Sequence, residues 1–345
     1  MQNTRIKKKI ILLDSVNSID EIKREITEIG NVRIITFDYD SHKNLLKNKI
    51  KHEISDEFLD ENKLQQIQNE SFNLTKWYDG TLKNSLGYED VNLGRTFYVE
   101  FHHYLLQILK KTIEIKNITK KESNAEFIVS PKLFKITNEF HSSVRQLDTK
   151  VNVNDEFLDD SIKFHLTNSV KFNLSRKSYQ KLKKSSEKIF SSIRSKEMKD
   201  GERSVLFVEF DPIKYERLFE KSKYHSLNFI LFNRRRPSMW NLSSYQVIKN
   251  SNCIIANAED VMNEKLSKII ESEQEKITKK VRNFWDNEEF FRTFFVFDNK
   301  SFWEIIKNDF QILCNNRMKE AINEICITKR ILEKFKISSI VCWSE

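Results

Sequence analysis

Short apolar runs alternate with amphipathic stretches over the first 256 residues, and this alternation constrains the fold more than any other feature of the sequence. Residues 9–13 form such a run, and isoleucines then recur over 19–29 at the spacing of one helical face. A β-branched run follows at 32–37. Because a strand, a helix and a strand in this order build a parallel sheet, the sequence opens with a predicted β-α-β unit.

The alternation continues beyond this opening. Further apolar runs predict strands at 126–129, 161–166, 204–210, 227–232 and 253–256. Helical patterns lie between the runs, at 55–78, 91–116, 170–195 and 212–222. We therefore expect an α/β domain over residues 1–256, with a Rossmann-like, doubly wound and mostly parallel sheet and a helical insertion at about 55–118.

The pattern changes after residue 256. Apolar residues recur at helical spacing over 257–336, which predicts a C-terminal pair of long amphipathic helices. Aromatic residues gather between these helices at 285–295, and we expect them in the core. A further strand is predicted within 337–345. We expect this strand to begin a second domain and the chain to be a fragment of a longer protein, because ligand loops follow the carboxyl ends of such strands.

Glycine is too scarce for most phosphate-binding loops, since the 345 residues include 5 Gly and 3 Pro. The motifs G-x-G-x-x-G, G-x-x-x-x-G-K, G-x-S-x-G and H-E-x-x-H are all missing from the sequence. This disfavours the common nicotinamide-binding, P-loop, lipase-type and zincin classes. The net charge of +9 favours anionic partners such as nucleic acids, nucleotide sugars or phospholipid headgroups. The basic residues are interleaved with acids, so an ordinary solvated surface is the alternative.

The four cysteines give no sign of a metal site, because they lack C-x-x-C pairs and a histidine at finger spacing. Their apolar neighbours predict buried thiols in a reducing compartment. Residues 10–13 are too few for the core of a signal peptide, and no apolar run approaches the length of a membrane span. We expect a cytoplasmic protein, with peripheral association at a membrane surface as a further expectation.

The most informative local feature is a cationic segment that directly follows the apolar run 228–232. It consists of Asn233, Arg234, Arg235 and Arg236, with Trp240 shortly after it. Guanidinium groups bind phosphate bidentately, and ligands of α/β proteins bind at the carboxyl ends of strands. We therefore predict that these side chains bind a phosphorylated ligand, with Trp240 available for stacking. The alternative is that the arginines pair with surface carboxylates or clamp a domain interface.

Three side chains are candidates for a general base. Asp38 begins the D-x-D pattern Asp38-Tyr39-Asp40 after the second predicted strand, where capping of the next helix is the competing role. Glu209 lies at a strand end, just before Asp211, which is placed to cap a helix. His103 belongs to an adjacent histidine pair on a predicted helix, where neighbouring side chains diverge and cannot easily chelate one ion.

Three stretches of the chain, 92–106, 228–240 and 337–345, together resemble the amino-terminal half of GT-B-like glycosyltransferases from archaeal and bacterial surface-polysaccharide biosynthesis clusters. The resemblance implies two Rossmann-like domains facing a cleft, and transfer of a sugar from a nucleotide donor to a surface glycan or a lipid-linked acceptor. It implies no tightly bound cofactor and no required metal, with a nucleotide sugar as the donor substrate. A second domain or subunit would complete the site.

Carried over by position, the resemblance assigns phosphate or acceptor contact to the three arginines 234–236 and the cleft wall to His102 and His103. Glu345 would stand at a strand end facing the partner domain. Two other functions stay open: a basic nucleic-acid-binding protein, although the leading hypothesis expects no nucleic acid partner, and a non-catalytic subunit that assembles through its long helices at 257–336. Steep salt dependence of nucleic-acid affinity would distinguish the first.

Overall fold

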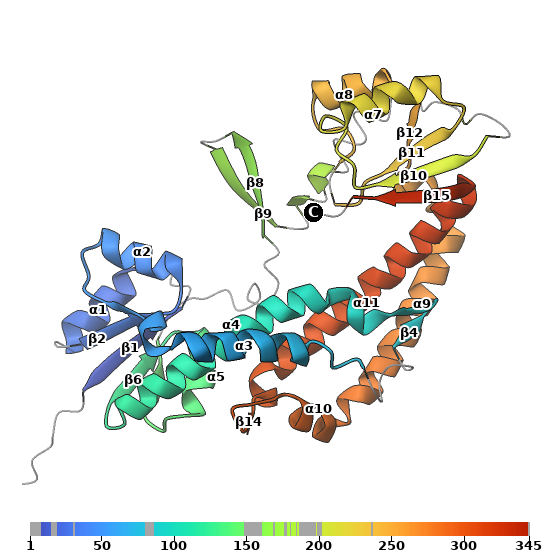
Figure 1. The fold of residues 1–345 in the computed structure, drawn as a ribbon. Helices are drawn as coiled ribbons and strands as arrows, with labels where there is room; N and C mark the ends of the chain where they lie inside the picture. The colour runs from blue at the N-terminus through green and yellow to red at the C-terminus, as the bar shows by residue number, and fades with distance from the viewer. Residues whose placement is uncertain are drawn as a thin grey trace, which may run out of the picture. The chain divides into compact units, whose positions relative to one another are not determined.

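The structure is a computed structural model, and it describes residues 8–14, 19–29, 32–79, 86–147, 161–167, 170–175, 178–179, 181–183, 185, 198, 202–235 and 237–343. The chain divides into two compact units (Figure 1). Unit 1 comprises Met1–Phe157 and Lys279–Arg317, and unit 2 comprises Leu158–Thr278 and Met318–Glu345. Each unit contains a parallel sheet covered by helices, so the protein has the Rossmann-like α/β fold that the sequence predicts.

The sheet of unit 1 has five strands in the order β3-β2-β1-β6-β7, all parallel to their neighbours. Their bounds are β1 Lys9–Leu13, β2 Val32–Thr36, β3 Glu53–Ile54, β6 Glu126–Val129 and β7 Val144–Gln146. The helices of this part of the chain are α1 Ile19–Ile29, α2 Tyr39–Lys47, η1 Ser55–Phe58, α3 Glu61–Leu74, η3 Leu93–Phe97, α4 Tyr98–Lys121 and α5 Pro131–Asn138. A small antiparallel pair, β4 Gly87–Tyr88 and β5 Val91–Asn92, precedes η3.

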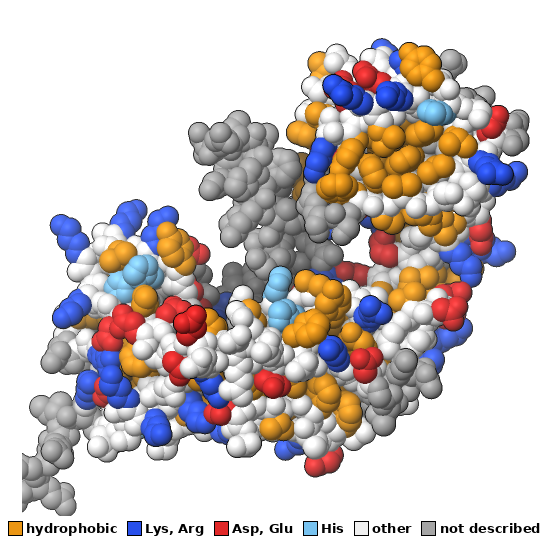
Figure 2. Space-filling model, viewed as in Figure 1, with side chains coloured by type: hydrophobic (Ala, Val, Ile, Leu, Met, Phe, Trp, Pro, Cys, Tyr) orange, Lys and Arg blue, Asp and Glu red, His pale blue; other side chains and the backbone are white. Residues whose placement is uncertain are grey.

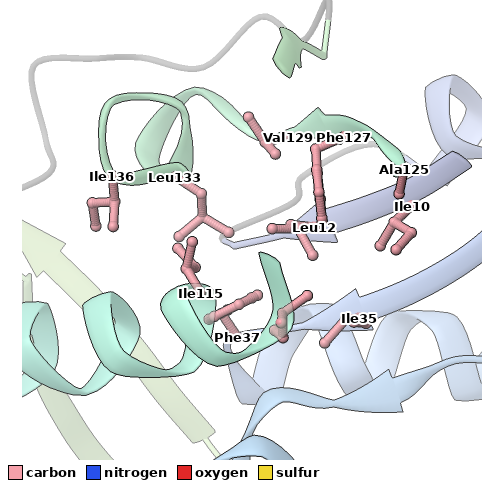
Figure 3. Close-up of a cluster of buried hydrophobic side chains, with 11 residues drawn as sticks. Ile10, Leu12, Ile35, Phe37, Ile115, Ala125, Phe127, Val129, Leu133 and Ile136 are labelled. Carbon is pink, nitrogen blue, oxygen red and sulfur yellow. The ribbon is translucent and has the colours of Figure 1, made fainter. Parts of the chain in front are cut away.

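Strand β1 shows why the sheet is covered on both faces. Ile10 and Leu12 pack into one cluster, with residues of α4 and α5, and Figure 3 shows this cluster. Ile11 and Leu13 pack into another cluster, with residues of α1 and α2. All four side chains are fully buried. A strand that is buried on both faces needs a continuous apolar run rather than alternation, which is what residues 10–13 supply.

The sheet of unit 2 has four parallel strands in the order β12-β11-β10-β15. Their bounds are β10 Ser204–Val208, β11 Asn228–Phe232, β12 Cys253–Ile255 and β15 Ile337–Cys342. Helices α7 Glu216–Lys221 and α8 Leu242–Lys249 contribute to the apolar cluster on one face, and the C-terminal part of α11 Trp303–Lys334 contributes to the cluster on the other. The short helices η5 Ser222–Tyr224 and η6 Ala258–Asp260 lie in the connections.

The predicted pair of long helices is present as α9 Glu264–Trp285 and α11, and the boundary between the units falls within each of them. Between them, α10 Glu288–Phe294 is followed by an antiparallel hairpin of β13 Val296–Phe297 and β14 Lys300–Ser301. The aromatic residues here lie in the core as expected, with Phe291 stacked on Trp303 at 4.6 Å between ring centroids.

Several expectations about the sheets were wrong. The strands expected in one sheet over 1–256 form two separate sheets, and the run at 337–343 belongs to the second of them, where it pairs with β10. The run at 161–166 lies in an antiparallel hairpin, β8 Ser161–Thr167 with β9 Val170–Ser175, so the start of the helix expected at 170–195 is a strand. Apolar periodicity marks strands but does not specify their partners, which explains these errors.

Two smaller expectations also changed. The helix expected from residue 91 begins at Tyr98, because β5 and η3 precede it. Cys253, Cys314 and Cys326 are buried as expected, and burial raises the pKa of the Cys314 thiol well above its ordinary value. Cys342 is exposed, because it lies on β15, most of whose side chains are exposed.

Candidate functional site

The cationic segment of unit 2 forms a turn at the carboxyl end of β11, beside the end of β10. Glu209 follows β10 with a φ of 62°, in the left-handed region that side chains rarely adopt. Its Oε1 atom accepts hydrogen bonds from the backbone N–H groups of Arg234, at 2.6 Å, and Arg235, at 2.8 Å. Strained backbone of this kind concentrates at functional sites, which draws attention to this edge of the sheet.

Residues 233–235 form the arginine turn. Other side chains bind the carbonyl groups of this turn. The buried ammonium of Lys183 donates to the carbonyl oxygens of Asn233, at 2.9 Å, and Arg234, at 2.8 Å. The Tyr179 hydroxyl donates to the carbonyl oxygen of Arg235 at 2.9 Å. The backbone of the turn is therefore fixed from both its donor and its acceptor sides.

The side chains of the arginine turn have different environments. Asn233 is buried, and its Nδ2 atom donates to the carbonyl oxygen of Phe210 at 2.9 Å, which ties the ends of β10 and β11 together. Arg234 pairs with Glu324, with 2.7 Å between Nε and Oε2, and its guanidinium also contacts the second carboxylate oxygen. For Arg234 the alternative role, pairing with a surface carboxylate, is therefore confirmed.

Of the two arginines of this segment that the structure describes, Arg235 is the one that remains available. Its side chain is exposed and forms no ion pair with any residue in the described part of the chain. Trp240 is 50% exposed, so its ring can stack on a ligand. Arg236 lies outside the described residues. An exposed guanidinium on a rigid turn can form two parallel hydrogen bonds to a phosphate group.

Unit 1 has a polar site that the sequence analysis missed, at the point where its strand order reverses between β1 and β6. Ligands of open α/β sheets bind in the crevice at such a switch point. Asp14 directly follows β1, and its N–H donates to the Oγ atom of Ser130, directly after β6, at 3.0 Å. The Asp14 carboxylate is 3% exposed and accepts from the ammonium of Lys111 at 2.6 Å. The sequence does contain one signal for this site, because Asp14 places a carboxylate immediately after the first apolar run.

A polar stripe on α4 continues from Lys111. His103, Gln107, Lys110, Lys111 and Glu114 recur at the spacing of one helical face. Burial raises the pKa of Glu114, and its hydrogen bond from Lys110 opposes this only in part. Burial lowers the pKa of Lys110, but hydrogen bonds to Glu114 and Asp56 outweigh burial, and the net effect raises this pKa. The stripe therefore contains the ion pair of Lys110 and Glu114, which hydrogen bonding holds in place, together with the exposed imidazole of His103.

The structure gives the three candidate bases different environments. Asp38 caps α2, accepting from the N–H of Ser41 at 2.8 Å, so its competing capping role is confirmed. Glu209 is occupied by the backbone of the arginine turn, and Asp211 accepts from the N–H of Ile213 at 2.8 Å. His103 is exposed, and its ring lies 6.0 Å from that of His102. Glu345 lies outside the described residues.

His102 and His103 differ in their surroundings. The His102 ring lies edge-on to Phe72 at 5.9 Å between centroids, and its Nε2 atom is buried without a hydrogen-bond partner among the described residues. His103 points to solvent from the neighbouring position. His102 is half-buried and His103 is exposed, so His103 is the more accessible of the two to a substrate.

Among the described residues that Figure 2 shows, positively and negatively charged side chains are interspersed. Within the described residues, no group of three or more His, Cys, Asp or Glu side chains is arranged to hold a metal ion. None of the helices, as far as the chain is described, combines the length and the apolar character of a membrane span. Comparisons with protein-family models, curated proteins and solved structures found no match.

Proposed function

We propose that the protein is a glycosyltransferase-like enzyme of the GT-B type, which transfers a sugar from a nucleotide donor to a surface glycan or a lipid-linked acceptor. The observation that carries the proposal is the presence of two Rossmann-like parallel sheets in one chain. The resemblance to an amino-terminal half implied that a second such domain would lie outside this sequence. Unit 2 supplies one within it.

Nucleotide binding is assigned to unit 2. Arg235 supplies a guanidinium that is exposed on a backbone fixed by Glu209 and Tyr179. A diphosphate gains two parallel hydrogen bonds from such a group, and the same contact offsets the charge that develops on the departing diphosphate. Trp240 supplies an exposed ring for the base or the sugar. Arg234 contributes less, because Glu324 already occupies its guanidinium.

Acceptor binding and proton transfer are assigned to unit 1. In the reaction, the acceptor hydroxyl attacks the anomeric carbon, the bond to the diphosphate breaks, and a base takes the hydroxyl proton. His103 is the best placed of the three candidate bases, because Asp38 and Glu209 already accept backbone hydrogen bonds. An exposed imidazole nitrogen can accept a proton, which is what a general base must do.

Isothermal titration calorimetry of the full chain with UDP, GDP and CDP, each in turn, tests the proposal. At least one nucleotide should bind. Arg235→Ala should weaken its binding about tenfold, the cost of losing a charge-assisted hydrogen bond. Arg217→Ala removes another exposed arginine of unit 2, on α7, and should change the affinity less than about twofold.

Two results would contradict the proposal. One is the failure of all three nucleotides to bind a folded chain. The other is equal affinity in the Arg235→Ala variant and the wild type, which would remove the arginine turn from the binding site. Tight binding of RNA or DNA with a steep dependence on salt would instead favour the nucleic-acid alternative.

A further inference from the structure

Unit 1 contains a partly open, mainly apolar cavity of about 210 Å³ that none of the roles above uses. Its walls come from α4, the end of α5, the β13–β14 hairpin and the first turn of α11. The apolar lining residues are Leu109, Ile113, Phe140, Phe297, Phe302 and Ile305. All four of these elements belong to unit 1, so the cavity is a feature of one compact body.

The polar atoms in the wall are already bonded within the protein. The Thr112 hydroxyl donates to the carbonyl oxygen of Ile108 at 2.7 Å, and the Ser301 hydroxyl donates to that of Phe295 at 3.4 Å. A buried water needs two to four polar partners, and an apolar cavity without them stays dry. The two hydroxyl groups therefore offer little to a polar ligand, and the mainly apolar surface of the cavity favours an apolar group.

The cavity is lined by two lysines and two acids, Lys116, Lys300, Glu139 and Asp298, and Lys63 reaches Asp298 from outside the lining. Lys116 and Lys63 both pair with Asp298, the latter at 3.0 Å, and Lys300 pairs with Glu139 at 2.9 Å. Three ammonium groups thus face two carboxylates. Each ammonium has three donors, so the lysines retain capacity for a further anionic partner.

The hairpin fixes this arrangement of charges around the cavity. Its two turn residues, Asp298 and Asn299, have φ values of 54° and 61°, as a tight turn between antiparallel strands requires. All three residues line the cavity, with the Phe297 side chain buried and the Asp298 and Lys300 side chains partly exposed to solvent. Hydrogen bonds from Lys116 and Lys63 hold the pKa of Asp298 below its ordinary value, so this carboxylate is charged at neutral pH.

We infer that this cavity binds a single alkyl or isoprenoid chain whose anionic headgroup, a phosphate ester, lies among Lys63, Lys116 and Lys300. The inference rests on the proposed function for its biological meaning, because such a molecule is the lipid part of a lipid-linked acceptor. A dry cavity of about 150 Å³ holds benzene, so this one holds about eight carbon atoms by proportion. Binding requires both the hydrocarbon chain and the charged phosphate group of the ligand, so inorganic phosphate alone should not bind in the same way.

Calorimetry of the full chain with butyl, hexyl, octyl and decyl phosphate, below their micelle-forming concentrations, tests the inference. Affinity should rise about fourfold per methylene, the gain expected for burying one CH2 group, and level off near eight carbons. Octanol should bind at least about tenfold more weakly than octyl phosphate, because it lacks the charge. Inorganic phosphate should not compete.

Two variants with matched controls locate the site. Ile113→Phe fills the cavity and should weaken octyl phosphate binding at least about tenfold, whereas Val99→Phe, at an exposed position of the same helix, should not. Lys300→Gln should weaken octyl phosphate binding several-fold and leave octanol unchanged. Lys76→Gln changes an exposed lysine outside the cavity and should have no effect.

Several outcomes would overturn the inference: no binding of any alkyl phosphate, no dependence on chain length, or unchanged affinity in Lys300→Gln, which alters only the surface and should fold normally. Unchanged affinity in a folded Ile113→Phe variant would do the same. Titration of the same samples with UDP, GDP and CDP, each in turn, separates the two claims. Octyl phosphate binding without nucleotide binding would leave the cavity assigned and the proposed function refuted, and the reverse would refute the cavity alone.

Discussion

Each sheet has an ion pair near the carboxyl ends of its strands, but the two pairs differ in how deeply they are buried. In unit 1 the ion pair is buried at the switch point, with Asp14 3% and Lys111 19% exposed. In unit 2 the pair beside the arginine turn lies at the surface, with Arg234 31% and Glu324 43% exposed. Removing one partner of a buried pair lowers stability strongly, whereas a surface pair contributes little to stability. Unit 1 therefore depends on its ion pair for stability, and the surface charges of unit 2 are available to bind a ligand.

The largest effect is expected for Asp14→Ala in unit 1. It leaves the Lys111 ammonium without this partner in a mostly buried position, and we expect the free energy of unfolding of unit 1 to fall by about 3 kcal/mol. Amide hydrogen exchange of β1 and β6 measures this locally. Asp20→Ala, an exposed change on α1, is the control. A loss below about 1 kcal/mol would mean that the buried pair resembles a surface pair.

Glu209→Ala should have the next largest effect. It removes the carboxylate that binds two backbone N–H groups of the arginine turn, and we expect unit 2 to lose about 2 kcal/mol of stability. Nucleotide affinity should fall as well, because Arg235 loses its fixed position. Glu209→Gln keeps an acceptor oxygen and should lose less of both. Equal losses in the two variants would indicate that the carboxylate does not hold the turn.

Glu324→Gln should have a small effect on unit 2, below about 1 kcal/mol, because the pair that it breaks is exposed. It also removes the carboxylate charge that pairs with the Arg234 guanidinium, so nucleotide affinity should stay equal or rise. Chemical denaturation and calorimetry on one preparation measure both quantities. A stability loss as large as that of Asp14→Ala would remove the contrast between the two units.

The smallest effect concerns the pH dependence of unit 1. Burial raises the pKa of Glu114, so the folded state binds this proton more tightly than the unfolded chain does. The penalty for ionising Glu114 is therefore absent in acid and develops as pH rises above the ordinary carboxyl pKa. Glu114→Gln should stabilise unit 1 relative to the wild type more at pH 7 than at pH 4.

Glu53 provides the contrast for this measurement, since its sign is opposite. The hydrogen bond from Arg33 lowers the pKa of Glu53, so the pair stabilises the fold above the ordinary carboxyl pKa and this is lost as pH falls through the lowered value. Arg33→Met should therefore flatten the acid limb of the stability curve. Glu114→Gln should raise the stability of unit 1 at pH 7 relative to pH 4, and Arg33→Met should lower it. If both variants changed this difference in the same direction, the pKa shifts assigned to Glu114 and Glu53 would be incorrect.

Much of the fold could be predicted because buried parallel strands need continuous apolar runs, as residues 10–13 and 228–232 show. The assignment of strands to two sheets could not be predicted, because β15 and β10 are far apart in the chain. The Ser338 hydroxyl, for example, donates to the carbonyl oxygen of Ser204, 134 positions away. Side-chain pairing was equally inaccessible. Asp14 and Lys111 are 97 positions apart, and no local pattern indicates that α4 brings them together.

The candidate site was predictable to a similar extent. The position of the arginines after a buried strand is a local feature, and the sequence identified it correctly. Which arginine remains exposed depends on Glu324, 90 positions from Arg234. The hydrogen bond that Glu209 accepts likewise comes from the backbone N–H of Arg234, 25 positions away. The sequence therefore indicated where the cations lie but not which of them is available.

Amide hydrogen exchange of the full chain, with and without a saturating nucleoside diphosphate chosen from UDP, GDP and CDP, tests the central claim most directly. The account predicts slower exchange at residues 209–211 and 233–235, where the arginine turn meets the end of β10. Unchanged exchange at this turn with all three nucleotides, or slower exchange confined to unit 1, would contradict it.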